Sequence, residues 1–226
     1  MTVVLLSPSN TEEYICSQNI NLFINAECKE LSTQGAKGRY LKLISNVPEK
    51  EALKVCLCED NYQGWLPLSS IKYLQPAKEK YQKKTVFREY IAQKIPAIIN
   101  FCLQAHQVSN YYLWGGTVAP NYDCSGLIQS AFASEGIWLP RDSYQQEDFC
   151  QKINREELEK GDLIFFGVQK VTHVALYLGN NQYIHSSGKD MGNNGIGINH
   201  LTDDLDQVSG NYYRELWSYG KVMQSL

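Results

Sequence analysis

The stretch Asn121–Gln129, with the sequence NYDCSGLIQ, contains the residue best suited to nucleophilic chemistry, Cys124. A thiol at a helix N-terminus faces free backbone N–H groups and the positive end of the helix dipole, and both favour the thiolate. Asp123 and Ser125 flank it with short polar side chains suited to a helix start. Apolar residues then recur along one helical stripe, at Leu127, Ile128, Ala131 and Phe132. The pattern favours a nucleophile, and a buried structural cysteine is the alternative.

Two of the four histidines, His173 and His185, fall in consecutive predicted strands separated by a turn at Gly179–Asn181. Strands joined by a tight turn pair with each other, so both imidazoles could reach one end or face of one sheet. Beside a thiolate that attacks a carbonyl carbon, one histidine takes the thiol proton and later protonates the leaving amine. A third polar group holds that imidazole in one tautomer. The alternative is that both are ordinary hydrogen-bonded strand histidines.

The elements that carry these residues indicate an α+β order. A helical apolar pattern begins at Thr85, and Pro96 inside it is expected to kink or break the helix near Ile95. The helix that follows Cys124 is expected to stop at Gly136. Short strands then follow, with ranges Asp162–Phe166, Thr172–Leu178, Gln182–Ser186, Gly195–His200 and Tyr213–Trp217. Helices followed by a mainly antiparallel sheet are typical of an α+β domain.

The chain up to about Leu74 is predicted to be a separate, small all-β unit. Its strand-like runs, punctuated by turn residues, are Ile20–Phe23, Glu27–Leu31, Tyr40–Ile44 and Lys54–Cys58. The closing segment NYQGWLPLSSIKYL resembles the end of a bacterial SH3-like module, most specifically at Gly64-Trp65-Leu66. The charged segment Pro76–Lys84 is interpreted as a linker or as the first turn of the next helix.

Composition excludes several classes of protein. The chain has 226 residues, enough for one large domain or two small ones, and a formal net charge of −3 that gives no reason to expect nucleic acid or an anionic membrane as partner. The seven cysteines are odd in number and irregular in spacing, which argues against disulfides and zinc and favours a reducing compartment. The N-terminus MTVVLLSPSNTEE is not expected to be a secretory signal. No apolar run approaches the roughly 18 residues that span a bilayer.

Five motifs in order resemble those of the NlpC/P60 family of cell-wall cysteine peptidases: YYLWGGTVAPNYDCSGLIQ, LPRDSYQQ, GDLIFF, THVALYLG and QYIHSSG. With the SH3-like module in front, the chain is similar to bacterial γ-D-glutamyl-L-diamino acid endopeptidases, which cleave the γ-D-Glu–diaminopimelate bond of peptidoglycan stem peptides. The resemblance implies a papain-like α+β catalytic domain, here residues 85–226. It would follow a small SH3-like barrel at residues 1–75 and a linker at 76–84. No cofactor and no metal are expected.

Carried over by motif position, Cys124 matches the nucleophile, His173 the base and His185 the orienting residue, and Tyr112 matches a tyrosine near the oxyanion site. The resemblance also implies a substrate-binding set. Trp114 would form a wall of the groove, Asp123 and Ser125 would lie near the free α-amine, and Tyr62 would close that end. Arg141 and Ser143 would shape the pocket for the D-Glu α-carboxylate. Arg141 as a loop buttress, Trp114 as core and Tyr62 as interface packing are the alternatives.

The predicted partner is therefore L-Ala-γ-D-Glu-diaminopimelate with a free N-terminus. Asp123 alone would raise the pKa of the neighbouring thiol, a cost that makes sense if its carboxylate binds a substrate ammonium. Such a preference suits a cytoplasmic recycling enzyme that acts on fragments released from the wall. Two other functions stay open: an amidase or acyltransferase on the same papain-like core, and a non-catalytic wall-binding protein.

Overall fold

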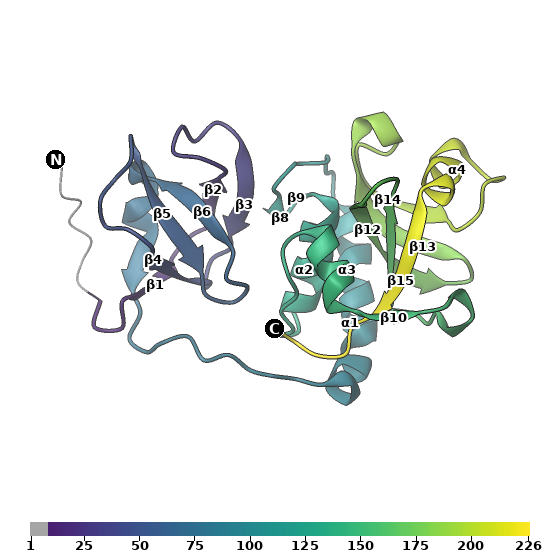
Figure 1. Ribbon diagram of the computed structural model, residues 1–226, viewed down its shortest axis with the longest axis horizontal. Helices are drawn as coiled ribbons and strands as arrows, with labels where there is room; N and C mark the ends of the chain where they lie inside the picture. Colours follow the sequence, from purple (N-terminus) through teal and green to yellow (C-terminus); the bar gives the residue numbers. More distant parts are fainter. Residues whose placement is uncertain (1–8) are drawn as a thin grey trace. The chain divides into compact units, whose positions relative to one another are not determined.

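The computed structural model describes residues 9–226 and divides into two compact units (Figure 1). One unit runs to Lys83 and includes Trp114–Val118, and the other comprises Lys84–Leu113 and Ala119–Leu226. Residues 1–8, on which most of the secretory-signal prediction rests, lie outside the described residues. That prediction and the predicted boundaries at residues 75, 76, 84 and 85 stay predictions.

The first unit is all-β, as predicted. Its seven-stranded antiparallel sheet has the order β3-β2-β6-β5-β4-β1-β7. The strands are β1 (Glu13–Cys16), β2 (Ile20–Phe23), β3 (Leu31–Gly35), β4 (Tyr40–Leu43), β5 (Ala52–Leu57), β6 (Gln63–Pro67) and β7 (Leu74–Pro76), with the 3-10 helix η1 at Leu68–Tyr73 and the short β8 at Thr117–Val118. Alternate side chains of the strands, such as Leu22, Leu41 and Leu66, are fully buried, which makes one continuous core.

The predicted strand Glu27–Leu31 is wrong. The strand in this region, β3, begins at Leu31, and the residues before it form the turn after β2. Ile24 N–H donates to the carbonyl of Glu30 and closes this turn, and Cys28 has a positive φ of 53°. The backbone of residues 25–29 therefore closes a loop instead of extending along a neighbour.

The second unit begins with a long helix, α1 (Arg88–Gln107), which continues through Pro96. The predicted break near Ile95 is therefore wrong. Ile91, Ile95, Ile98 and Cys102 form one buried stripe on both sides of the proline. Pro96 itself is on the exposed face, where water can satisfy the carbonyl that the missing N–H leaves free.

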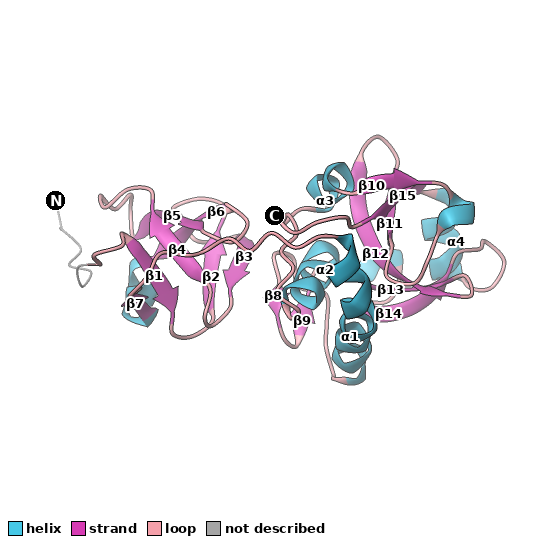
Figure 2. Cartoon of the chain, turned by 90° about the horizontal axis from the view of Figure 1, so that it is seen from below, coloured by secondary structure: helices cyan, strands magenta, loops and turns pink. Residues whose placement is uncertain are grey.

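The remainder of the second unit is a six-stranded antiparallel sheet in the order β10-β15-β11-β12-β13-β14. The strands are β10 (Gln151–Ile153), β11 (Leu163–Gly167), β12 (Val171–Gly179), β13 (Gln182–Ser187), β14 (Gly195–His200) and β15 (Leu216–Lys221), and the further elements are β9 (Asn121–Tyr122), α2 (Cys124–Ala133), α3 (Ser143–Phe149), α4 (Gln207–Arg214) and the 3-10 helices η2 (Arg155–Glu157) and η3 (Lys189–Met191). Figures 1 and 2 show α1 and α2 on one side of this sheet and α4 on the other.

Helices cover both faces of the sheet, which explains why β11 is apolar at every position. Leu163 and Phe165 belong to the cluster shared with α1 and α2, and Ile164 and Phe166 belong to the cluster on the side of α4. Because side chains alternate across a strand, an unbroken apolar run needs a hydrophobic layer on each face. The sheet is thus the middle layer of the unit, and α2 packs directly against β12 and β13.

The predicted strand Tyr213–Trp217 is also wrong in part. Residues up to Arg214 belong to α4, and the strand that follows is β15, which begins at Leu216. Asp206 caps α4 by accepting from the Ser209 N–H. The segment YRELW is therefore shared between the end of a helix and the start of a strand, which local periodicity does not separate.

Candidate active site

Cys124 is the first residue of α2, as its motif predicts. The side chain of Asp123 caps the helix, with Oδ1 accepting from the Gly126 N–H at 2.6 Å. The backbone N–H groups of Val174 and Ser125 lie near the Cys124 sulfur and favour its thiolate form. Since Val174 follows His173 in β12, the thiol lies against the part of the sheet that carries this histidine.

The environment of Cys124 opposes its ionisation in the ligand-free protein. Burial, and after it the carboxylate of Asp123, raise the pKa of the thiol to about 12. The two backbone N–H groups and Arg141 act in the opposite direction, and their effect is smaller. The predicted effect of the helix start is therefore present, but burial outweighs it and the neutral thiol is favoured.

His173 on β12 and His185 on β13 are in direct contact, with 2.7 Å between His173 Nε2 and His185 Nδ1. Burial lowers the pKa of both rings: that of His185 falls to about 4, and that of His173 falls well below 6.5, with His185 as a second cause. Both imidazoles are thus held neutral near pH 7. A neutral His173 can accept a proton, as the base of an acyl transfer must.

Aromatic rings surround this histidine pair. The Tyr212 ring centroid, from α4, is 4.4 Å from that of His173 and 4.8 Å from that of His185. Phe166 packs on both His173 and Tyr212, and the Tyr212 hydroxyl is 2.9 Å from Ser187 Oγ. Sequence reasoning missed Tyr212 because it did not predict α4. These rings exclude water from the imidazoles and restrict their rotation.

A buried ion pair lies beside the nucleophile. Arg141 Nη2 is 2.6 Å from Asp123 Oδ2, and Arg141 Nη1 donates to Asp123 Oδ1 at 3.1 Å and to Ser125 Oγ at 2.9 Å. The Arg141 side chain is only 2% exposed. Its guanidinium therefore orients Asp123 and Ser125, and its influence on a ligand passes through them. Ser143, the fourth polar residue of the predicted pocket, is buried at the start of α3.

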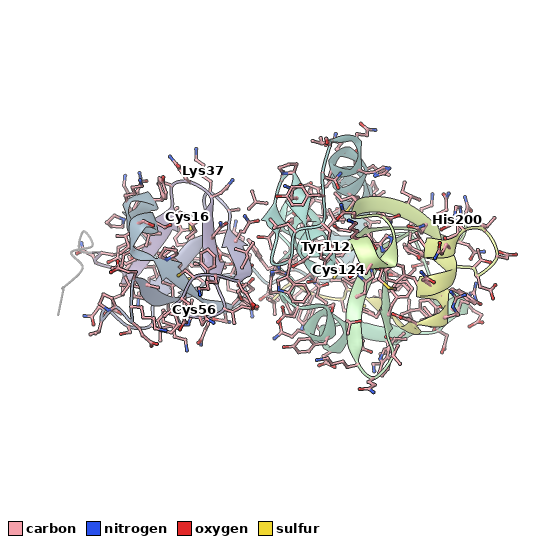
Figure 3. The ribbon with its side chains drawn as sticks, turned by 90° about the horizontal axis from the view of Figure 1, so that it is seen from above. Cys16, Lys37, Cys56, Tyr112, Cys124 and His200 are labelled. Carbon is pink, nitrogen blue, oxygen red and sulfur yellow. The ribbon has the colours of Figure 1, made fainter. Side chains whose placement is uncertain are left out.

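Tyr112 lies near the same group. Its pKa is raised, first by burial and then by electrostatic interaction with Cys124 and Asp123. Figure 3 shows Tyr112 and Cys124 next to each other. The hydroxyl stays protonated at neutral pH, and a protonated hydroxyl can donate a hydrogen bond to a developing oxyanion.

Not all of the predicted substrate-binding residues belong to the second unit. Tyr62 and Trp114 belong to the first unit, where the Tyr62 hydroxyl is 3.1 Å from Ser32 Oγ and Trp114 is 67% exposed. Their roles toward a substrate stay predictions. His106 contacts the carbonyl of Ile196, and His200 lies well apart from Cys124 (Figure 3).

Residues 9–226 contain no group of three or more His, Cys, Asp or Glu side chains that could hold a metal ion. Within the same range, no helix has both the length and the apolar character needed to cross a membrane.

Two parts of the chain match known families of domains. Residues 109–218 match the NlpC/P60 family, and residues 22–71 match the bacterial dipeptidyl-peptidase Sh3 domain. A probable endopeptidase NlpC homolog from Haemophilus influenzae is 46% identical over 81 residues, which are 35% of this chain and 43% of that protein. A gamma-D-glutamyl-L-lysine dipeptidyl-peptidase from Bacillus cereus is 44% identical over 79 residues, 33% of this chain and 24% of that protein.

These matches span less than half of each relative. A crystal structure of an NlpC/P60 family protein from Bacillus cereus is similar over 96% of this chain and 66% of that one, with a TM-score of 0.52 and 22% identity. That similarity concerns the fold. The two family matches identify residues 109–218 as an NlpC/P60 domain and residues 22–71 as a bacterial dipeptidyl-peptidase Sh3 domain.

Proposed function

We propose that the protein is a cysteine endopeptidase that hydrolyses the γ-D-Glu–diamino acid bond of peptidoglycan stem peptides. The observation that carries the proposal is the 2.7 Å contact between His173 and His185, together with a Cys124 thiol that lies near the backbone N–H of Val174, the residue after His173. A nucleophile, a base and an orienting group in this order perform acyl transfer on several unrelated folds. The match to the NlpC/P60 family and the similarity to a γ-D-glutamyl-L-lysine dipeptidyl-peptidase support a peptidoglycan peptide as the substrate.

The reaction follows from which ring atoms are occupied. His173 Nε2 is engaged with His185, so His173 Nδ1 is the atom that takes the thiol proton. The thiolate of Cys124 attacks the γ-carbonyl carbon of D-Glu, and the Tyr112 hydroxyl donates to the resulting oxyanion. The C–N bond breaks as His173 returns its proton to the leaving amine of the diamino acid. Water, deprotonated by the same imidazole, then hydrolyses the thioester and restores the thiol.

Diaminopimelate is the proposed diamino acid, and the Bacillus cereus relative named for γ-D-glutamyl-L-lysine supports the γ-D-Glu side of the bond. Arg141 and Ser143 would shape the pocket for the D-Glu α-carboxylate. Trp114 would form a wall of the groove.

A free N-terminal L-Ala is the second proposed requirement. Asp123 would attract the substrate ammonium while sharing its carboxylate with Arg141, Ser125 would hydrogen-bond beside it, and Tyr62 would close the groove beyond it. In intact wall this amine is an amide, which lacks the charge and adds bulk. A carboxylate that loses a cation partner costs several kcal/mol, which corresponds to a discrimination of about 10²-fold or more.

Such a preference suits recycling of released wall peptides in the cytoplasm. All seven cysteines of the described residues are free, which agrees with a reducing compartment.

The test is mass spectrometry of the products from L-Ala-γ-D-Glu-diaminopimelate. We expect L-Ala-D-Glu and free diaminopimelate from the wild type and no products from the matched Cys124→Ala variant. The N-acetylated peptide should be cut at least about 10²-fold more slowly. Equal rates on the two peptides would refute amine recognition, and efficient lysis of intact sacculi would refute recycling. Transfer to an added amine without hydrolysis would identify an acyltransferase, and binding without turnover a wall-binding protein.

A further inference from the structure

The hydrogen bonds around the two histidines continue beyond His185 into a third strand and the start of a helix. His185 Nε2 is 2.9 Å from Asn199 Oδ1 on β14, and Asn199 Nδ2 is 3.2 Å from Asp206 Oδ1 at the cap of α4. Asn199 is 6% exposed and His185 is fully buried. We propose that Asn199 and Asp206 are positioning residues that select the tautomers of His185 and His173. The inference rests on the proposed function, in which His173 is the base.

Asp206 determines which atom donates and which accepts in each of these hydrogen bonds. A carboxylate only accepts hydrogen bonds, so it fixes the amide of Asn199 with the NH₂ group toward Asp206 and the oxygen toward His185. His185 Nε2 must then carry a proton and donate it to that oxygen. His185 Nδ1 is left as an acceptor and receives the Nε2–H of His173. His173 Nδ1 keeps its lone pair, which is what a base facing a thiol needs.

A neighbouring amide makes the selection necessary. Asn193 Nδ2 lies 3.2 Å from His185 Nε2 and 2.9 Å from Asn199 Oδ1. If His185 Nε2 accepted from Asn193, the ring would carry its proton on Nδ1 and donate it to His173 Nε2. The proton of His173 would then sit on Nδ1 and block the base. The structure therefore contains two opposite hydrogen-bond directions, and Asp206 favours the productive one through Asn199.

Asp206 also caps α4, through bonds of 2.9 Å from the Ser209 N–H and 2.5 Å from Ser209 Oγ. A test must separate this capping from the selection of tautomers. Asp206→Ser does so, because serine is a good N-cap residue and its short hydroxyl cannot reach Asn199. Asn199→Leu removes the amide and keeps the branched shape of the side chain. Asn193→Ala is the matched control, because it removes the competing donor and leaves the hydrogen bonds from His185 through Asn199 to Asp206 intact.

The first readout is the tautomer of each histidine, measured by long-range ¹H–¹⁵N correlation NMR of the full chain at neutral pH. The second is the rate at which iodoacetamide alkylates Cys124, followed by mass spectrometry of the peptide that contains it. Neither readout uses a substrate. A wrong choice of peptide bond would therefore leave both unchanged, which distinguishes failure of the inference from failure of the proposed function.

We expect the Nε2–H tautomer for both His173 and His185 in the wild type. Asn199→Leu should shift His173 toward Nδ1–H and slow the alkylation of Cys124 by about tenfold or more, and Asp206→Ser should do the same to a smaller extent. Asn193→Ala should stay within about twofold of the wild type. A wild-type His185 protonated on Nδ1 would overturn the inference. So would wild-type tautomers and alkylation in folded Asp206→Ser protein, even if the leucine variant failed to fold.

Discussion

Acid should destabilise the second unit through His185, by an amount that follows from its burial. The pKa of this imidazole is about 4 in the folded protein, against an ordinary value of 6.5. Between these values the unfolded chain binds a proton that the folded chain does not. The stabilisation is therefore complete above pH 6.5 and is lost as the pH falls toward 4. At pH 4 the loss amounts to about 3 kcal/mol of the free energy of unfolding. About 2 to 3 kcal/mol is already lost at pH 4.5.

The assay is urea denaturation of the wild type and of His185→Gln at several values between pH 4.5 and 7.5. Amide hydrogen exchange of β12 and β13 assigns the transition to the second unit. The variant retains the acidic side chains and the other histidines. The difference between the pH dependences of the two unfolding free energies therefore reports on the pair His173 and His185. His173 adds to the effect, because its pKa is lowered partly by His185. We expect the stability advantage of the wild type to shrink by at least about 2 kcal/mol on acidification. Parallel pH profiles would show that His185 is not held neutral by burial.

Three further predictions concern the nucleophile and its surroundings. Cys124→Ala should abolish hydrolysis of the stem tripeptide with an unchanged circular-dichroism spectrum, and residual activity within about tenfold of the wild type, only ~1.4 kcal/mol of barrier, would refute the nucleophile. Arg141→Met should lower the free energy of unfolding by about 3 to 5 kcal/mol, because it leaves Asp123 buried without its cation. Lys94→Met, at a more exposed ion pair, should have a much smaller effect in the same denaturation experiment. Tyr212→Leu should lower kcat and keep KM near the wild-type value, since Tyr212 packs on the histidines, and a change in KM alone would contradict this role.

The sequence alone determined the parts of this protein that depend on local signals. The capped start of α2 at Cys124 follows from a polar pair before an apolar helical stripe, and the structure has Asp123 as the cap. The hairpin that carries His173 and His185 follows from two strand-like runs around Gly179–Asn181, where Asn180 and Asn181 have the positive φ of such a turn. These features involve residues within a few positions of each other, so sequence spacing predicts them.

Tertiary structure alone decided which distant groups complete the site. Asn199 and Asp206 reach His185 only because β14 pairs with β13 and α4 starts just beyond it, and Arg141 reaches Asp123 across 18 residues. The end of α4 and the start of β15 were not separable in the sequence, because a segment as short as YRELW fits either element until packing selects one. Side-chain charges, hydrogen-bond directions and burial depend on neighbours from other elements, and periodicity contains no information about those neighbours. For this reason the sequence indicated the nucleophile and both histidines, whereas the groups that orient them and hold them neutral required the fold.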